Sequence, residues 1–228
     1  AFSPGAVIAI GYKGEPALHP NIDAILDSIR RHNKLQAVVE TSGIGWGDGP
    51  VDRLRPVMTS NITFIIELDT DDPALYRSLR GDGYQEAHRF ADAMIAAYPH
   101  QTYVQATRLE ETESNLPTFY RSWKERTDNI IIQKYNNYAG RLPERKVADL
   151  SPLVRFPCRH LQRELAITVD GDVVRCFQDL DREAPRGNVF RDSLESVWAA
   201  GADEYGGQVA GNYSEMCKKC DEYYTFNA

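Results

Sequence analysis

The sequence predicts an α/β protein in two parts: a parallel sheet wound by helices, followed by a small hairpin-plus-helix domain with four cysteines. Three observations lead to this prediction. In the first part, short β-branched runs alternate with apolar residues at helical spacing; the apolar period is lost between Ala139 and Leu153; and all four cysteines lie beyond that point. Alternating strands and helices favour parallel strands joined by helical crossovers.

Five apolar runs are short enough to be strands. They occupy residues 6–10, 37–40, 61–68, 103–107 and 129–133. Helix-spaced apolar residues fall between them, at residues 22–29, 87–98 and 116–126. We therefore expect a five-stranded parallel sheet with helices between its strands.

The stretch "AGRLPERKVADLSPL", residues 139–153, has two prolines, many charges and no apolar period, which is typical of a linker. We therefore expect one domain over residues 1–145 and a second over residues 154–228.

Within the second domain, "ELAITV" and "DVVRC" flank Asp170-Gly171, which predicts a β-hairpin with a tight primed turn. Counted from that turn, Cys176 falls opposite Leu165. Further on, Asp192 with Glu195 signals the start of a helix.

Composition and charge exclude some classes of binding partner and indicate the cellular setting. A chain of 228 residues can bury a sizeable core. A net charge of −7 argues against nucleic acid or an anionic membrane as the main partner. No stretch stays apolar for the roughly 18 residues of a membrane-spanning helix, and the first residues show no signal-peptide pattern. We therefore expect a reducing, cytoplasmic setting, where paired cysteines bind metal more often than they form disulfides.

The four cysteines form two pairs: Cys158 and Cys176 across the predicted hairpin, and Cys217 and Cys220 in a Cys-x-x-Cys turn. Four thiolates from two such elements suit a zinc ion or an iron–sulfur cluster. Zinc ribbons usually present a close pair on both elements, so the 17 residues between the first two cysteines favour a cluster. Two disulfides or four buried free thiols are the alternatives. His160 is nearby, but four thiolates complete a coordination shell, so we expect it to play a supporting role.

The cysteine pattern, with Gly171 between the first pair, resembles the SPASM auxiliary-cluster domain that follows the barrel of many radical S-adenosylmethionine (SAM) enzymes. The segment "GNVFRDSLESVW", residues 187–198, is similar to what those domains carry between their pairs. Upstream, "KGEPALHP" at residues 13–20 resembles the family's Gly-Gly-Glu-Pro loop, and "ETSG" at residues 40–43 resembles its Thr-Asn-Gly strand end. "LYRSLRGDGY", residues 75–84, resembles the segment after the fourth barrel strand.

The resemblance implies a partial (β/α) barrel of radical SAM type, TIM-barrel-like, that lacks its first strand unit, because such a barrel has six strands and five are predicted here. The family's Cys-x-x-x-Cys-x-x-Cys, which holds the SAM-cleaving cluster, is absent from the sequence. We expect it some tens of residues upstream in the gene; a relative that has lost the chemistry is the alternative. Phe226 stands where the full SPASM pattern has a further cysteine, so one auxiliary cluster is expected.

On this resemblance, the chain is the C-terminal part of an enzyme that reductively cleaves SAM to a 5′-deoxyadenosyl radical and modifies a peptide, protein or small metabolite. The cofactors it implies are SAM and a [4Fe–4S] cluster, and the electron donor is flavodoxin- or ferredoxin-like. The implied cluster ligands are Cys158, Cys176, Cys217 and Cys220. The implied SAM contacts are Gly14, Glu15 and Pro16, with Ser42 and Asp69 at strand ends. The alternative is a noncatalytic α/β binding module stabilised by a four-cysteine zinc ribbon.

Overall fold

The computed structural model describes residues 3, 5–183 and 185–224 of the chain. They form two compact units, which we call the sheet unit, up to Tyr135, and the cysteine unit, from Asn136 onward. Phe226, which the sequence places where a further cysteine would stand, lies outside the described residues.

The sheet unit is built on five parallel strands in the order β1-β2-β3-β4-β5, which confirms the predicted sheet. The strands are β1 (Val7–Ile10), β2 (Gln36–Thr41), β3 (Ile62–Glu67), β4 (Thr102–Arg108) and β5 (Ile130–Lys134). Among the described residues no ladder joins β1 to β5, so the sheet is open. Because all five strands run the same way, the loops that follow them gather at one edge.

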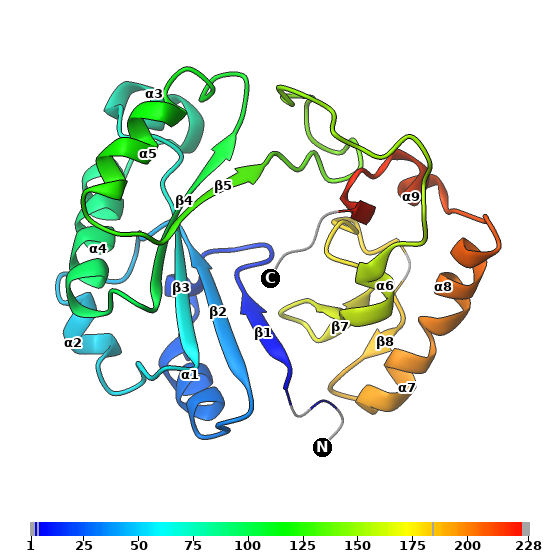
Figure 1. The fold of residues 1–228 in the computed structure, drawn as a ribbon. Coiled ribbons are helices and arrows are strands. Elements are labelled where there is room, and N and C mark those ends of the chain that lie inside the picture. Colours follow the sequence, from blue (N-terminus) through cyan, green and yellow to red (C-terminus); the bar gives the residue numbers. More distant parts are fainter. Residues whose placement is uncertain (1–2, 4, 184, 225–228) are drawn as a thin grey trace. The chain divides into compact units, whose positions relative to one another are not determined.

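Helices connect consecutive strands and lie along one face of the sheet (Figure 1). The three predicted helices are present as α1 (Ile22–Arg30), α4 (Tyr84–Ala97) and α5 (Leu116–Lys124). Three short elements were not predicted: η1 (Pro16–Leu18), α2 (Pro50–Leu54) and α3 (Pro73–Arg80). Their lengths of three, five and eight residues give a 3.6-residue period too few turns to show in the sequence.

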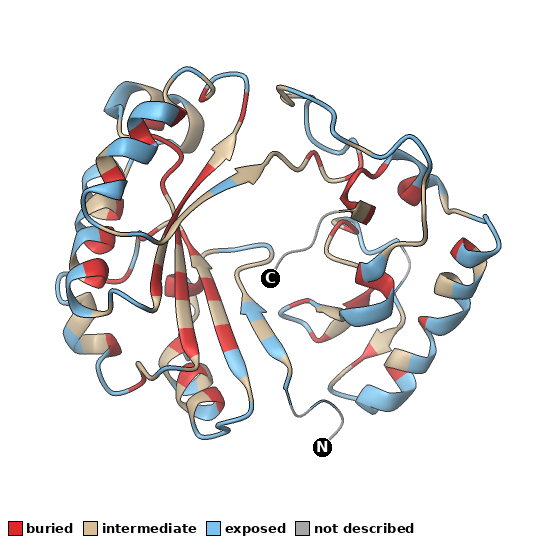
Figure 2. Ribbon diagram, viewed as in Figure 1, coloured by how far each residue is buried: buried red, intermediate tan, exposed pale blue. Residues whose placement is uncertain are grey.

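The core of the sheet unit lies between the strands and these helices. On β3, Ile62, Phe64 and Ile66 are fully buried while their neighbours are not, so alternate side chains face the helices (Figure 2). Trp46 packs against Phe64 and Phe90, with ring centroids 5.5 Å apart in both pairs. The unit therefore buries a continuous apolar cluster of its own.

The cysteine unit has a small antiparallel sheet in the order β6-β7-β8. Its strands are β6 (Ala166–Ile167), β7 (Asp172–Val174) and β8 (Gly187–Asn188). Its helices are α6 (Arg159–Arg163), α7 (Leu194–Ala199), α8 (Ala202–Val209), α9 (Glu215–Lys219) and η2 (Glu222–Tyr224). The hairpin of β6 and β7 confirms the prediction, and β8 adds a strand that the sequence did not reveal.

The predicted turn of this hairpin is wrong in type. The Gly171 N–H donates to the Thr168 carbonyl at 2.9 Å, and the Thr168 N–H donates to the Asp172 carbonyl at 2.9 Å, which closes a loop of three residues. Gly171, with a φ of 82°, takes the left-handed position. This is a turn with a glycine bulge, and it moves the register by one residue, so that Ala166 pairs with Val174. Cys176 is therefore in register with Glu164 and not with Leu165.

The predicted start of α7 is also wrong by one residue. Ser193 is the N-cap, and its hydroxyl accepts the Ser196 N–H at 3.2 Å. Asp192 instead accepts the Asn188 N–H at 2.8 Å, which closes the loop that follows β8.

The segment predicted as a linker is fastened to the cysteine unit, whose boundary at Asn136 precedes it. Ala139 packs with Met216, Cys217 and Cys220. The Lys146 ammonium pairs with the Asp221 carboxylate at 2.9 Å. The prolines and charges of residues 139–153 interrupt the apolar period, but the segment still packs on the cysteine unit. Among the described residues, no helix has both the length and the apolar character needed to cross a bilayer.

Candidate metal centre

Most of the residues that the sequence singled out lie in two sites, and Asp69 lies apart from both. The first is the loop after β1, which Glu15 fastens to the end of β2. Glu15 Oε2 accepts the Ser42 N–H at 2.8 Å and the Ser42 hydroxyl at 2.6 Å. Glu15 Oε1 accepts the Ala17 N–H at 3.2 Å and the Thr41 hydroxyl. The structure thus brings together Glu15 and Ser42, which the sequence placed at neighbouring strand ends.

Thr41 is a member of this cluster that the sequence analysis did not select. Its side chain is buried, and Oγ1 also accepts the Trp46 indole N–H at 2.9 Å and the Gly43 N–H at 3.0 Å. A hydroxyl at the last position of an apolar strand was the available signal. Beside the cluster, Pro16 is buried as the first residue of η1, whereas Gly14 is exposed and a Cβ built on it would meet open space.

Asp69 has a different set of partners. It accepts the Thr107 N–H at 2.8 Å and pairs with the Arg80 guanidinium at 2.6 Å, and Arg80 also reaches Glu67 at 2.9 Å. Asp69 adopts a φ of 66°, in the left-handed region that few non-glycine residues occupy. Its carboxylate ties the ends of β3 and β4 to α3.

Glu40 is a further ionisable residue near this edge that the sequence did not single out as a site residue. The residues on either side of it, Val39 and Thr41, are buried toward the helices, so Glu40 projects from the opposite face of the sheet. Burial raises the pKa of the Glu40 carboxyl above its ordinary value, and the charge of Glu67 adds to the rise. Such perturbed carboxyls are often functional.

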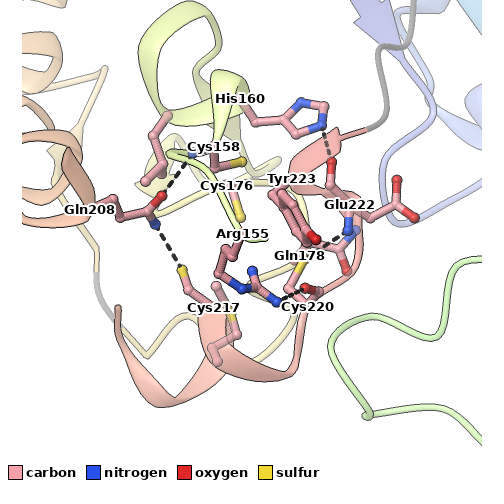
Figure 3. A pocket seen from close by; sticks show the side chains of 12 residues that line it. Arg155, Cys158, His160, Cys176, Gln178, Gln208, Cys217, Cys220, Glu222 and Tyr223 are labelled. Carbon is pink, nitrogen blue, oxygen red and sulfur yellow. Dashed lines mark hydrogen bonds between the residues drawn. The ribbon is translucent and has the colours of Figure 1, made fainter. Parts of the chain in front are cut away.

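The second site is a pocket in the cysteine unit that all four cysteines line (Figure 3). Cys158 is the N-cap of α6, Cys176 follows β7, Cys217 lies within α9, and Cys220 is the C-cap of that helix. All four are free thiols. The hairpin and the Cys-x-x-Cys helix therefore deliver their thiols to one place, as their spacing predicted.

The described residues contain no group of three or more His, Cys, Asp or Glu side chains placed to hold a single metal ion. A tetrahedral zinc site needs its sulfurs about 2.3 Å from one point. The four thiols nevertheless line one pocket, which makes them the ligands available there to a metal ion or a cluster.

Burial affects the protonation of three of these thiols. It raises the pKa of Cys220 to about 12 and that of Cys176 further. It also raises the pKa of Cys158, and the neighbouring Cys217 adds to the rise. A buried thiolate is costly without a compensating charge, and a cationic metal centre would supply that charge.

Polar groups of the protein surround the thiols. The Glu222 N–H donates to Cys220 Sγ at 3.3 Å. The Arg155 guanidinium donates to the Cys220 carbonyl at 2.7 Å and lies 4.1 Å from the centre of the Tyr223 ring. His160 is buried, and its ring nitrogens contact Glu164 Oε1 at 2.8 Å and the Glu222 carbonyl at 3.1 Å. Both ring nitrogens of His160 therefore have protein partners, and its supporting role stays a prediction.

Gln178 tests whether the pocket fits an iron–sulfur cluster. Its side chain lines the pocket and is buried, and neither its amide nitrogen nor its amide oxygen has a hydrogen-bond partner. A buried amide without a partner is costly, and cluster sulfur atoms can accept its N–H. Four thiols and an orphaned amide donor therefore fit such a cluster.

Comparison with known proteins agrees with this description. Residues 158–221 match the SPASM family, described as an iron-sulfur cluster-binding domain. An uncharacterised protein of Treponema pallidum (strain Nichols) is 36% identical over 239 residues, which cover 99% of this chain and 67% of that protein.

Two solved structures share the fold. Streptococcus suis SuiB, bound to the precursor peptide SuiA, matches with a TM-score of 0.73 at 18% identity, over 90% of this chain and 56% of SuiB. The protein anSMEcpe, with bound AdoMet and the Kp18Cys peptide, matches with a TM-score of 0.63 at 15% identity, over 96% of this chain and 74% of its own. This chain thus spans about two thirds of the Treponema relative and little more than half of SuiB. The fold predicted from the sequence is confirmed.

Proposed function

Since the chain belongs to the SPASM-containing radical SAM family, we propose that Cys158, Cys176, Cys217 and Cys220 hold one auxiliary [4Fe–4S] cluster in a radical SAM enzyme. The observation that carries this proposal is the pocket that all four thiols line. The orphaned amide of Gln178 and the cost of burying thiolates without a cation support it.

We further propose that SAM lies at the C-terminal ends of the strands, near Gly14, Glu15, Pro16 and Ser42. Both Glu15 oxygens already accept hydrogen bonds from Ala17, Thr41 and Ser42, so its carboxylate acts chiefly as a brace for the loop. The exposed backbone at Gly14 is then the part of the loop that contacts the methionine group. Asp69 contributes by holding the strand ends through Arg80 and Thr107.

In the complete enzyme, reductive cleavage of SAM supplies a 5′-deoxyadenosyl radical that abstracts a hydrogen atom from the substrate. The SAM-cleaving cluster requires a cysteine triplet that this sequence does not contain, so that activity is proposed for the whole protein. We propose a peptide as the substrate class, because SuiB and anSMEcpe are solved with peptides bound. A flavodoxin- or ferredoxin-like donor would supply the electrons, and thiolate ligands favour a reducing compartment such as the cytoplasm.

The competing function is a noncatalytic binding module held by a four-cysteine zinc ribbon. The match of residues 158–221 to an iron-sulfur cluster-binding family favours the cluster over zinc.

The full-length gene product distinguishes the two functions. Purified anaerobically, reduced with dithionite and mixed with SAM, it should release 5′-deoxyadenosine. A full-length sequence without an upstream Cys-x-x-x-Cys-x-x-Cys, or a reduced iron-loaded protein that leaves SAM intact, would contradict the catalytic proposal and leave the fold and the cluster-binding proposal standing.

A further inference from the structure

One buried glutamine connects two of the four cysteines. Gln208, near the end of α8, is 2% exposed. Its Oε1 accepts the backbone N–H of Cys158 at 2.9 Å, and its Nε2 donates to the Sγ atom of Cys217 at 3.4 Å (Figure 3). The Cys158 segment and the α9 helix are thus joined through a single amide.

The two contacts fix the orientation of this amide. A backbone N–H can only donate, so the Gln208 carbonyl oxygen must face Cys158. The amide NH₂ is then directed at Cys217. A flipped amide would turn its NH₂ toward the Cys158 N–H, so that two donors would face each other, and its oxygen toward the thiolate sulfur. Both hydrogen bonds would be lost.

Gln208 is a side-chain donor, whereas Cys158, Cys176 and Cys220 accept N–H groups of the backbone. Cys220 Sγ accepts its hydrogen bond from the main chain of Glu222, which side-chain substitution does not remove. The donor to Cys217 is a side chain and can be changed.

We propose that Gln208 is a positioning residue that fixes Cys158 and Cys217 relative to each other and, through its N–H···S bond, raises the reduction potential of the centre that they hold. The proposal rests on the proposed role of the four cysteines as cluster ligands. An N–H donor draws electron density from a thiolate sulfur and so stabilises the reduced, more negative state. Removing the donor therefore lowers the reduction potential.

Two substitutions at this position separate the donor from the acceptor. Gln208→Met keeps the length of the side chain and removes both hydrogen bonds. Gln208→Glu keeps an acceptor for Cys158 and removes the amide N–H donor. Burial raises the pKa of such a carboxyl, so the potential of this variant is measured at pH 7 and at pH 9. The matched control is Gln162→Met, an exposed glutamine of α6 that does not line the pocket.

The experiment uses the full chain, reconstituted anaerobically with iron and sulfide. Iron per chain, the potential from an EPR-monitored redox titration, and the Fe–S(Cys) resonance Raman bands are measured for each protein. We expect Gln162→Met to match the wild type and Gln208→Met to be reduced at a more negative potential. Gln208→Glu should fall below Gln208→Met at the pH where its carboxyl is ionised. The Raman bands of both 208 variants should shift.

Equal iron with a potential and Raman bands unchanged from the wild type, or with a raised potential, would overturn the proposal. A wild-type chain that binds no iron would contradict the proposed function before any variant is compared. If the variants at position 208 do not bind iron, a Gln178→Met chain with ¹⁵N-labelled glutamine side chains replaces them in the test. This substitution removes the other glutamine that lines the pocket. ENDOR of its reduced centre should then detect a ¹⁵N coupling from Gln208, and no coupling would overturn the assignment.

Discussion

The sheet unit and the cysteine unit are stabilised by different kinds of contact. In the sheet unit, a continuous cluster of buried apolar residues runs from η1 to α5 and includes Trp46, Phe64 and Trp123. In the described part of the cysteine unit, the cluster around the thiols has four buried members, Ala139, Met216, Cys217 and Cys220. Two of these four are themselves proposed ligands.

Charged contacts take the place of a larger core in the cysteine unit. Glu204 pairs with Arg175 at 2.6 Å and with Arg186 at 3.2 Å, and these pairs connect α8 to the ends of the small sheet. Such pairs rarely stabilise a fold as strongly as an apolar core of equal area. The comparison indicates that the sheet unit folds on apolar burial and that the cysteine unit depends on its metal centre.

The largest expected effect is the loss of that centre. Cys176→Ala should remove most of the bound iron, because the remaining three thiols leave one cluster iron without a protein ligand. Hydrogen exchange should then lose protection throughout the cysteine unit and keep it in β2, β3 and β4. Lys218→Ala is the control: this residue lies between two cysteines, and its side chain forms an exposed ion pair with Glu215. Loss of hydrogen-exchange protection in both units together would contradict the inference that the sheet unit folds without the metal centre.

The converse substitution removes part of the apolar core of the sheet unit. Phe64 is fully buried against Trp46 and Phe90, so Phe64→Ala should lower the free energy of unfolding by about 3–5 kcal/mol. Urea denaturation followed by tryptophan fluorescence measures this loss, and iron per chain should stay at the wild-type value. Tyr120→Ala, at an exposed position of α5, serves as the control. Iron loss with Phe64→Ala would show that the cysteine unit needs the sheet unit's core.

A smaller effect is expected at the strand-end loop. Glu15→Gln leaves one oxygen to accept bonds that two oxygens now share, and it turns an NH₂ toward the donors of Ser42 or Ala17. The loss of stability should be about 1–3 kcal/mol in thermal unfolding. Glu110→Gln, on an exposed loop, controls for the change of charge. An unchanged melting temperature would mean that the hydrogen bonds of Glu15 are not needed to hold the loop.

The smallest effect concerns pH. Since the folded-state pKa of Glu40 is raised above 4.5, the native state binds more protons than the unfolded state at pH values above 4.5. Glu40 therefore contributes less stability as the pH rises. Glu40→Gln should stabilise the protein at pH 7 by on the order of 1 kcal/mol, and the gain should vanish near pH 4. Thermal unfolding at both pH values checks this, and an equal effect at both would contradict the raised pKa.

A feature of the fold or of the site could be predicted from the sequence when residues close together in the chain determine it. The five strands and the long helices were predictable because their side chains alternate locally with the required period. The four cysteines were predictable as one site because their spacing brings two loops together. The three-residue turn was missed because Asp-Gly also fits a two-residue primed turn, and only the pairing of Thr168 with Asp172 distinguishes them.

The polar residues around the thiols were beyond local reasoning. Gln208 lies in the glycine-rich stretch "EYGGQVAG". Its amide finds its hydrogen-bond partners only when α8 packs beside Cys158 and Cys217. Thr41 was missed because its partners Glu15 and Trp46 are set by tertiary structure, and Gln178 because only the fold places its side chain in the pocket. Asp69 was placed at a strand end from the sequence, but its ion pair with Arg80 could not be foreseen.

The composition of the centre tests the central claim most directly. Reconstituted anaerobically and desalted, the chain should carry about four irons and four sulfides, with the Mössbauer spectrum of a [4Fe–4S] cluster, because its four cysteines can hold one such cluster and no more. The variant with all four cysteines replaced by serine should carry none. A colourless protein with a single zinc ion, or disulfides that reductant breaks without releasing metal, would contradict the account.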